Sequence, residues 1–104
     1  MEKHRVDFAS IPWESPAAGV RFKAYRQGGR RLRLVEFSKE FIEPDWCRKG
    51  HIGMVLEGEA EVDFDGRAVR FSAGDGVFIP PGQAHKHKAR VLTDKAVLIL
   101  VEDE

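Results

Sequence analysis

The sequence predicts an all-β protein, built as a small antiparallel sandwich or barrel. Three observations lead to this prediction. Apolar and acidic residues alternate with a period of two, as where Ala60 and Val62 flank Glu61. Clusters of glycine, proline and aspartate divide the chain into short segments. No long segment shows the periodicity of an amphipathic helix.

Residues 1–19 contain Pro12 and Pro16, and we expect them to form an N-terminal arm or a short edge strand. The barrel domain is then expected over residues 20–104. A chain of 104 residues allows one domain with one modest core.

The first hairpin is predicted from segments 20–26 and 31–37, which flank a Gln-Gly-Gly turn. The stretch RQGGRR at residues 26–31 resembles a phosphate-binding loop, but no helix follows whose N-terminus could hold an anion. We therefore expect a hairpin end exposed to solvent.

The second hairpin is predicted around Asp65-Gly66, because both central positions of such a tight turn need a positive φ angle. The strand before it covers residues 60–64. Alternation then predicts the residues that point inward. We expect the interior to contain Val62, Phe64, Val69, Phe71 and Ile79.

Pro80 and Pro81 cannot donate to a sheet, so a strand must end or reach an edge there. The last strand, residues 95–102, is apolar on both faces, which predicts that both faces are covered. Because such a short chain buries little surface alone, we expect a homodimer, with a second subunit or the N-terminal arm as the cover.

Seventeen basic residues balance seventeen acidic ones, so charge gives no reason to expect nucleic acid or a membrane surface as a partner. The N-terminus is charged and lacks the apolar core of a signal peptide. The single cysteine, Cys47, cannot form an internal disulfide. These features predict a cytoplasmic protein.

Four residues stand at the spacings of a known motif, in which glycine, proline, glycine and histidine precede an asparagine; here Ala89 takes the asparagine position. The four are Gly74, Pro80, Gly82 and His85. Residues 30–100 thereby resemble the cupin superfamily. The resemblance implies a small single-domain cupin, an antiparallel jelly-roll β-barrel that is commonly dimeric and binds a small molecule.

The first cupin motif departs from the family pattern of a His-x-His pair followed by glutamate. The glutamate position falls on His51, before the glycine of the VLEGE turn. The shorter permitted gap puts the histidine pair on Asp45 and Cys47, which are both metal-binding residue types. The longer gap puts it on Pro44 and Trp46, which are not.

Strand parity supports a shared site, because residues two or four apart in a strand share a face. Cys47 and His51 then point the same way, as do His85 and His87. A thiolate with imidazoles and an open position suits Zn²⁺ or Fe²⁺ and also Ni²⁺ or copper. We therefore expect a divalent metal, most of all Zn²⁺ or Fe²⁺, bound by these four residues, with Asp45 nearby to orient a ring or add a ligand.

Alternatives remain open for several of these residues. His87 fits a fourth ligand, a pocket-lining donor or a solvent-facing histidine, and Cys47 alone fits a small core residue. Lys49 shares the ligand-face parity, which would place a cation beside the metal unless the chain bulges at Gly50. His4 is expected at the surface.

Three functions fit these observations, and fold alone does not choose among them. The first is a metal-dependent enzyme, such as an oxygenase, decarboxylase or isomerase, that acts on a small metabolite. The second is a binding or sensing module that holds a small molecule in the same pocket without turnover. The third is a metal-free barrel that acts through its surface.

Overall fold

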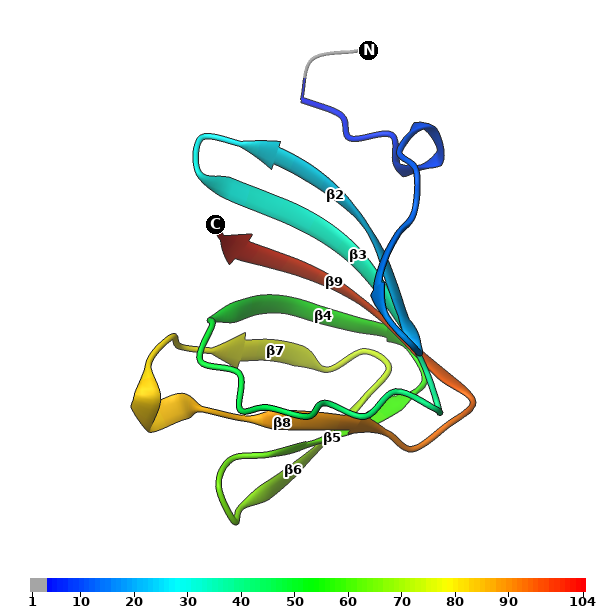
Figure 1. The fold of residues 1–104 in the computed structure, drawn as a ribbon. Coiled ribbons are helices and arrows are strands. Elements are labelled where there is room, and N and C mark those ends of the chain that lie inside the picture. The colour runs from blue at the N-terminus through cyan, green and yellow to red at the C-terminus, as the bar shows by residue number, and fades with distance from the viewer. Residues whose placement is uncertain (1–3) are drawn as a thin grey trace.

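The structure, a computed structural model, describes residues 4–104. They form an antiparallel β-barrel of two sheets with almost no helix, which confirms the predicted fold class (Figure 1). The elements are η1 (Phe8–Ser10), β1 (Glu14–Ala17), β2 (Val20–Gln27), β3 (Arg30–Ser38), β4 (His51–Glu57), β5 (Glu59–Asp63), β6 (Ala68–Ser72), β7 (Gly76–Ile79), η2 (Gln83–His85), β8 (Lys88–Val91) and β9 (Lys95–Asp103). Among residues 4–104 we find no helix long and apolar enough to span a bilayer.

The larger sheet has the strand order β1-β2-β3-β9-β4-β7, and the smaller has the order β6-β5-β8. The C-terminal strand β9 therefore lies between β3 and β4, in the middle of the larger sheet (Figure 1). Strand β1 pairs with β2 at the edge of this sheet.

The predicted turns have the expected chemistry. Asp65 and Gly66 have φ angles of 57° and 100°, and the N–H of Phe64 donates to the Arg67 carbonyl over 2.8 Å. Strand β7 ends at Ile79, immediately before the two prolines.

The core lies between the sheets and is made of the inward residues of β2, β3, β4, β7 and β9. Val35 and Val55 are fully buried at its centre. The predicted interior residues Val62 and Ile79 are buried, whereas Phe64 and Phe71 pack against the core with partial exposure. The fifth, Val69, is half-buried.

The rest of the protein covers only one of the two apolar faces of β9. Its inward residues Ala96 and Leu100 are buried. The outer face continues into β4 and β7 and exposes large apolar side chains to solvent. These are Ile52, Met54, Leu56, Phe78 and Val101, here called the outer apolar face.

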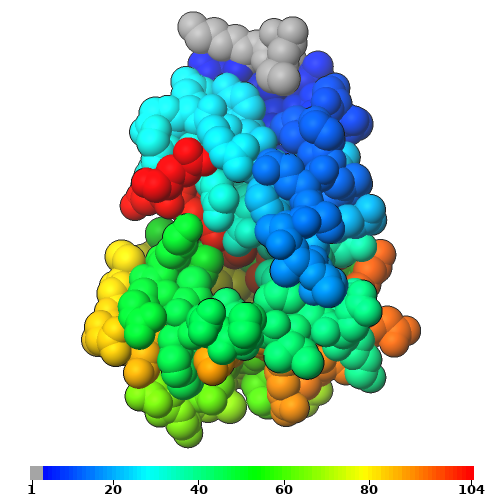
Figure 2. Space-filling model, viewed as in Figure 1, coloured from blue at the N-terminus to red at the C-terminus, as the bar shows by residue number. Residues whose placement is uncertain are grey.

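A cavity of about 410 Å³ opens between the two sheets. Figure 2 shows the surface hollowed between the blue and cyan N-terminal strands and the green segment that precedes β4. The cavity lining is mostly apolar, and it also includes charged side chains and Cys47.

Candidate metal centre

One end of the larger sheet presents polar side chains inward. Arg31 on β3 pairs directly with Glu102 on β9, and the pairing of Ile52 with Val101 brings His51 on β4 to the other side of Glu102. The next inward residue of β9 is the buried Leu100. The barrel interior therefore changes from apolar to polar within one step along these strands.

Cys47 reaches this end through a backbone bridge outside the named strands. Its N–H donates to the carbonyl of His87 over 2.8 Å, and the N–H of His87 donates back over 2.9 Å. This antiparallel bridge joins the segment before β4 to the segment before β8. It holds the two side chains beside His51.

Three donor atoms converge here, one each from Cys47, His51 and His87, and they lie within 4.8 Å of one another. Cys47 Sγ is 3.7 Å from His51 Nε2. His51 donates its Nδ1 proton to Glu102, and His87 donates its Nδ1 proton to the carbonyl of His85 over 3.0 Å. Each ring therefore keeps Nε2 free to face the sulfur, which is the usual arrangement of metal-binding histidines.

The residues fit a divalent metal in their chemistry, and Cys47 and His51 also fit one in their spacing. Zinc bonds of about 2.3 Å to sulfur and 2.0 Å to nitrogen, at a tetrahedral angle, separate the two donor atoms by about 3.5 Å. The 3.7 Å between Cys47 and His51 is close to this value. Three protein donors also leave a fourth position for water or a ligand.

The charges in the donor group stabilise one another. Hydrogen bonds from His51 and His87 lower the pKa of Cys47 to about 5, although burial opposes this. Burial alone would lower the pKa of His51, but its hydrogen bonds to Cys47 and Glu102 raise it to about 9. The pKa of His87 is also raised, because its contact with Cys47 outweighs burial. The metal-free group is therefore a thiolate beside imidazolium.

Glu102 anchors the donor group from behind. Its side chain is 1% exposed and accepts hydrogen bonds from Arg31 Nε over 2.9 Å and Arg33 Nη2 over 2.8 Å. Burial would raise the pKa of Glu102, but His51 and Arg33 lower it to about 2. The carboxylate stays ionised and fixes the His51 ring.

The structure does not bring the other predicted site residues into the group. His85 ends η2 with an exposed side chain, and only its carbonyl contacts His87. Asp45 and Lys49 are exposed. The alternation rule does not apply to these residues, because β4 begins only at His51 and because His85 lies in a 3-10 turn. Lys49 lines the cavity near Cys47, but it is exposed to solvent and is not part of the donor group. His4 is exposed as expected.

Sequence reasoning missed Glu102 and assigned no pocket role to Arg31 or Arg33. Arg31 was expected in a solvated hairpin, yet its side chain is only 18% exposed. The alternation of residues along the strand could have identified Glu102, because Leu98, Leu100 and Glu102 share one face of β9. A charge that ends an inward apolar series indicates a buried partner.

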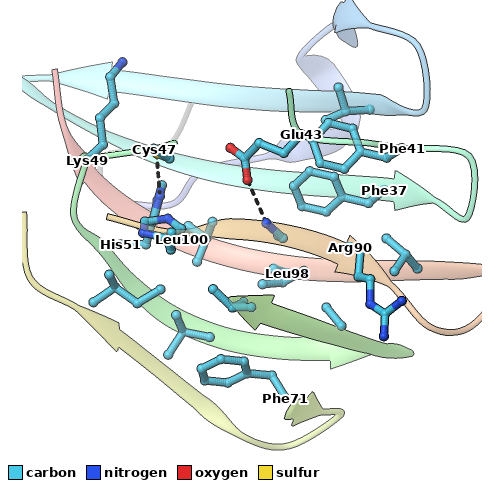
Figure 3. Close-up of a pocket in the computed structure, with 18 of the residues that line it drawn as sticks. Phe37, Phe41, Glu43, Cys47, Lys49, His51, Phe71, Arg90, Leu98 and Leu100 are labelled. Atoms are coloured by element: carbon cyan, nitrogen blue, oxygen red, sulfur yellow. Dashed lines mark hydrogen bonds between the residues drawn. The ribbon is translucent and has the colours of Figure 1, made fainter. Parts of the chain in front are cut away.

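The cavity joins this polar end to an aromatic end. Figure 3 shows Cys47 and His51 on one side and Phe37 and Phe41 on the other. Glu43 lies between them and accepts a hydrogen bond from the N–H of Ala89 over 2.8 Å. Burial raises the pKa of Glu43, although that hydrogen bond opposes the shift.

A two-sheet antiparallel barrel with a pocket for a small ligand is the architecture of the cupins. Residues 42–102 match the cupin domain family, and the chain belongs to that family. No curated protein matches it.

Solved structures share the fold. A KdgF protein from Halomonas sp. is 24% identical, with 92% of this chain and 91% of that chain covered and a TM-score of 0.72. An RmlC-like cupin from Shewanella frigidimarina is 22% identical, with 98% and 91% covered and a TM-score of 0.73. A cupin 2 conserved barrel domain protein from Salinispora arenicola is 20% identical, with 100% and 89% covered and a TM-score of 0.71.

Proposed function

We propose that this cupin binds one divalent metal through Cys47, His51 and His87 and acts on a small molecule in the adjoining cavity. The observation that carries the proposal is the convergence of three donor atoms within 4.8 Å, with each histidine ring held through Nδ1. Thiolate and imidazole ligands favour Zn²⁺ or Fe²⁺, and they also accept Ni²⁺ or copper.

The reaction class we propose is a metal-dependent conversion of a small metabolite, as in oxygenases, decarboxylases or isomerases. The bound metal would supply Lewis acidity toward an oxygen of the substrate. The protein supplies the rest. Glu102 holds the His51 ring, the apolar walls exclude water, and Glu43 offers a carboxyl group of raised pKa for proton transfer.

The alternative is a binding or sensing module that uses the same pocket without turnover. Both functions need the metal group and the cavity, so metal content does not separate them. Candidate metabolites incubated with the metal-loaded protein do separate them, because an enzyme consumes its ligand and a sensor returns it unchanged.

We propose a cytoplasmic location, because a reducing compartment keeps Cys47 as a free thiol for the metal. We also propose a homodimer. Burial of the outer apolar face against a second copy would remove its five large side chains from water.

Elemental analysis of freshly purified protein and of protein reconstituted with zinc or anaerobic iron tests the metal proposal. We expect about one metal per chain in the wild type, and less than about a tenth in Cys47→Ser and His87→Ala. His85→Ala is the decisive comparison. If Cys47, His51 and His87 hold the metal, this variant keeps it. If His85 is a ligand, as the cupin motif predicts, the variant loses the metal.

His4→Ala is the control, since this exposed residue lies outside the donor group. A wild-type protein that stays metal-free after reconstitution would overturn the proposal. Cys47 would then be a structural or redox-active thiol rather than a ligand.

A further inference from the structure

The buried carboxylate of Glu102 has more positive charge around it than it can neutralise. Arg31 and Arg33 both donate to it, and their side chains are only 18% and 13% exposed. The Cys47 thiolate balances the His51 imidazolium, so two guanidinium groups against one carboxylate leave one positive charge in excess. A partly buried excess charge is unfavourable unless a counter-charge joins it.

Both arginines also keep unused hydrogen-bond donors. A guanidinium group has five N–H donors, and each of these arginines directs one nitrogen at Glu102. The Arg33 Nε is buried and has no partner among residues 4–104. An unsatisfied buried donor is costly, and a negative charge brought to this guanidinium group would offset part of that cost.

The side chains of Arg31 and Arg33 line the cavity, and the other lining residues define the rest of the ligand. Both arginines line it, and the exposed Lys49 lies at the same end. The opposite end carries aromatic and aliphatic side chains, with Arg90 at its margin (Figure 3). Its side chains include Phe37, Phe41, Phe71, Val91 and Leu98.

We propose that Arg31 and Arg33 bind the carboxylate of a small organic acid whose apolar part occupies the aromatic end of the cavity. This inference deepens the proposed function and rests on it, because it names the ligand class of the same pocket. Guanidinium groups match carboxylates in geometry as well as in charge. The carboxylate would supply the missing negative charge beside Glu102.

Calorimetry with two matched probes tests the inference on the reduced, EDTA-treated full chain. 3-Phenylpropionate carries a carboxylate on an apolar body, and 3-phenylpropionamide has nearly the same shape without the charge. We expect the acid to bind at least about tenfold more tightly than the amide, since hydrogen bonds to charged groups are worth more than 1.4 kcal/mol. Equal dissociation constants in the wild type would overturn the inference.

Two variants test which arginine causes the preference for the acid over the amide. In Arg31→Gln the ratio of dissociation constants should fall to near one, whereas Arg90→Gln should keep the wild-type ratio. Arg90 is the matched control, because it lines the same cavity but pairs with Glu61 over 3.0 Å. Loss of the preference in Arg90→Gln, with retention in Arg31→Gln, would place the anion elsewhere and overturn the inference.

Arg31→Lys keeps the charge but loses the forked donor, so a several-fold fall in the ratio supports the inference even if Arg31→Gln does not fold. An unchanged ratio in Arg31→Lys together with an unfolded Arg31→Gln would contradict it. The same titrations after zinc loading separate the two proposals. If the protein binds no zinc but still prefers the acid, only the metal proposal is rejected. If it binds zinc but has equal affinity for the acid and the amide, only the carboxylate site is rejected.

Discussion

Cys47 depends for its chemistry on two imidazole rings that lie beside its sulfur. A thiol in apolar surroundings has a raised pKa, because burial disfavours the charged form. Hydrogen bonds from His51 and His87 reverse that effect and lower the pKa of Cys47 to about 5. The sulfur is therefore already ionised at neutral pH, as a metal ligand must be.

The ionisation of Cys47 gives the first prediction. Ultraviolet absorbance of the thiolate in reduced, metal-free protein should titrate with a midpoint near 5. His51→Ala should move the midpoint upward, toward the ordinary value of 9.0, because it removes the main donor to the sulfur. His85→Ala is the control and should leave it unchanged.

The sign of the effect on stability follows. A pKa that is lowered on folding adds stability that is lost as pH falls through about 5. The His51 ring that lowers it has a raised pKa of about 9 and loses its proton there, so the thiolate–imidazolium pair stabilises the native state between about 5 and 9. A wild-type midpoint near 9.0 would show that the rings do not reach the sulfur.

Single residues also explain how far sequence could identify the site. The cupin register places Cys47 and His51 at ligand positions, and the structure does bring their donor atoms together. The same register selects His85, but the 3-10 turn of η2 turns that side chain to solvent and leaves His87 in the group. Parity holds only inside a continuous strand, so it could not decide between these two histidines.

Strand β9 organises the site at the scale of secondary structure. Its inward residues change from Leu98 and Leu100 to Glu102, which lies between β3 and β4 in the sheet. Arg31 of β3 therefore lies on one side of Glu102, and His51 of β4 lies on the other. The alternating pattern of the strands predicts the hairpins and the core, but the strand order that makes these neighbours depends on contacts distant in sequence.

Removal of the Glu102 charge gives the second prediction. Glu102→Gln should lower the free energy of unfolding by about 3 to 5 kcal/mol, because both arginines lose a buried carboxylate partner. Chemical denaturation measures this change. Glu36→Gln is the matched control, since Glu36 pairs with Arg21 near the surface and should cost less than about 1 kcal/mol.

The pH dependence of stability should differ between these proteins. The pKa of Glu102 is lowered from 4.5 to about 2, so its contribution is complete above 4.5 and is lost as pH falls toward 2. Glu102→Gln should lack that part of the acid dependence. Equal stability of wild type and Glu102→Gln at neutral pH would refute the role of this carboxylate.

At the scale of the whole molecule, the outer apolar face explains the apolar character of the last strand. Alternation predicts cover on both faces of β9, but the N-terminal strand β1 pairs with β2 at the sheet edge. Ile52, Met54 and Phe78 consequently remain 46%, 44% and 74% exposed. The chain by itself leaves this apolar surface in water.

The oligomeric state gives the third prediction. Sedimentation of the wild type at micromolar concentration should give the mass of a dimer, and Met54→Glu should give a monomer, because a charge in the outer apolar face opposes its burial. Ile42→Glu is the control, since Ile42 is 81% exposed and lies outside that face. A monomeric wild type would contradict the prediction.

The identity of the atoms around the metal tests the central claim most directly. X-ray absorption at the zinc edge of reconstituted protein should show one sulfur at about 2.3 Å and nitrogen ligands at about 2.0 Å. His85→Ala should give the same spectrum as the wild type, whereas Cys47→Ser and His87→Ala should give almost no zinc signal, because they no longer hold the metal. A spectrum with only nitrogen and oxygen neighbours in the wild type would contradict metal binding through Cys47.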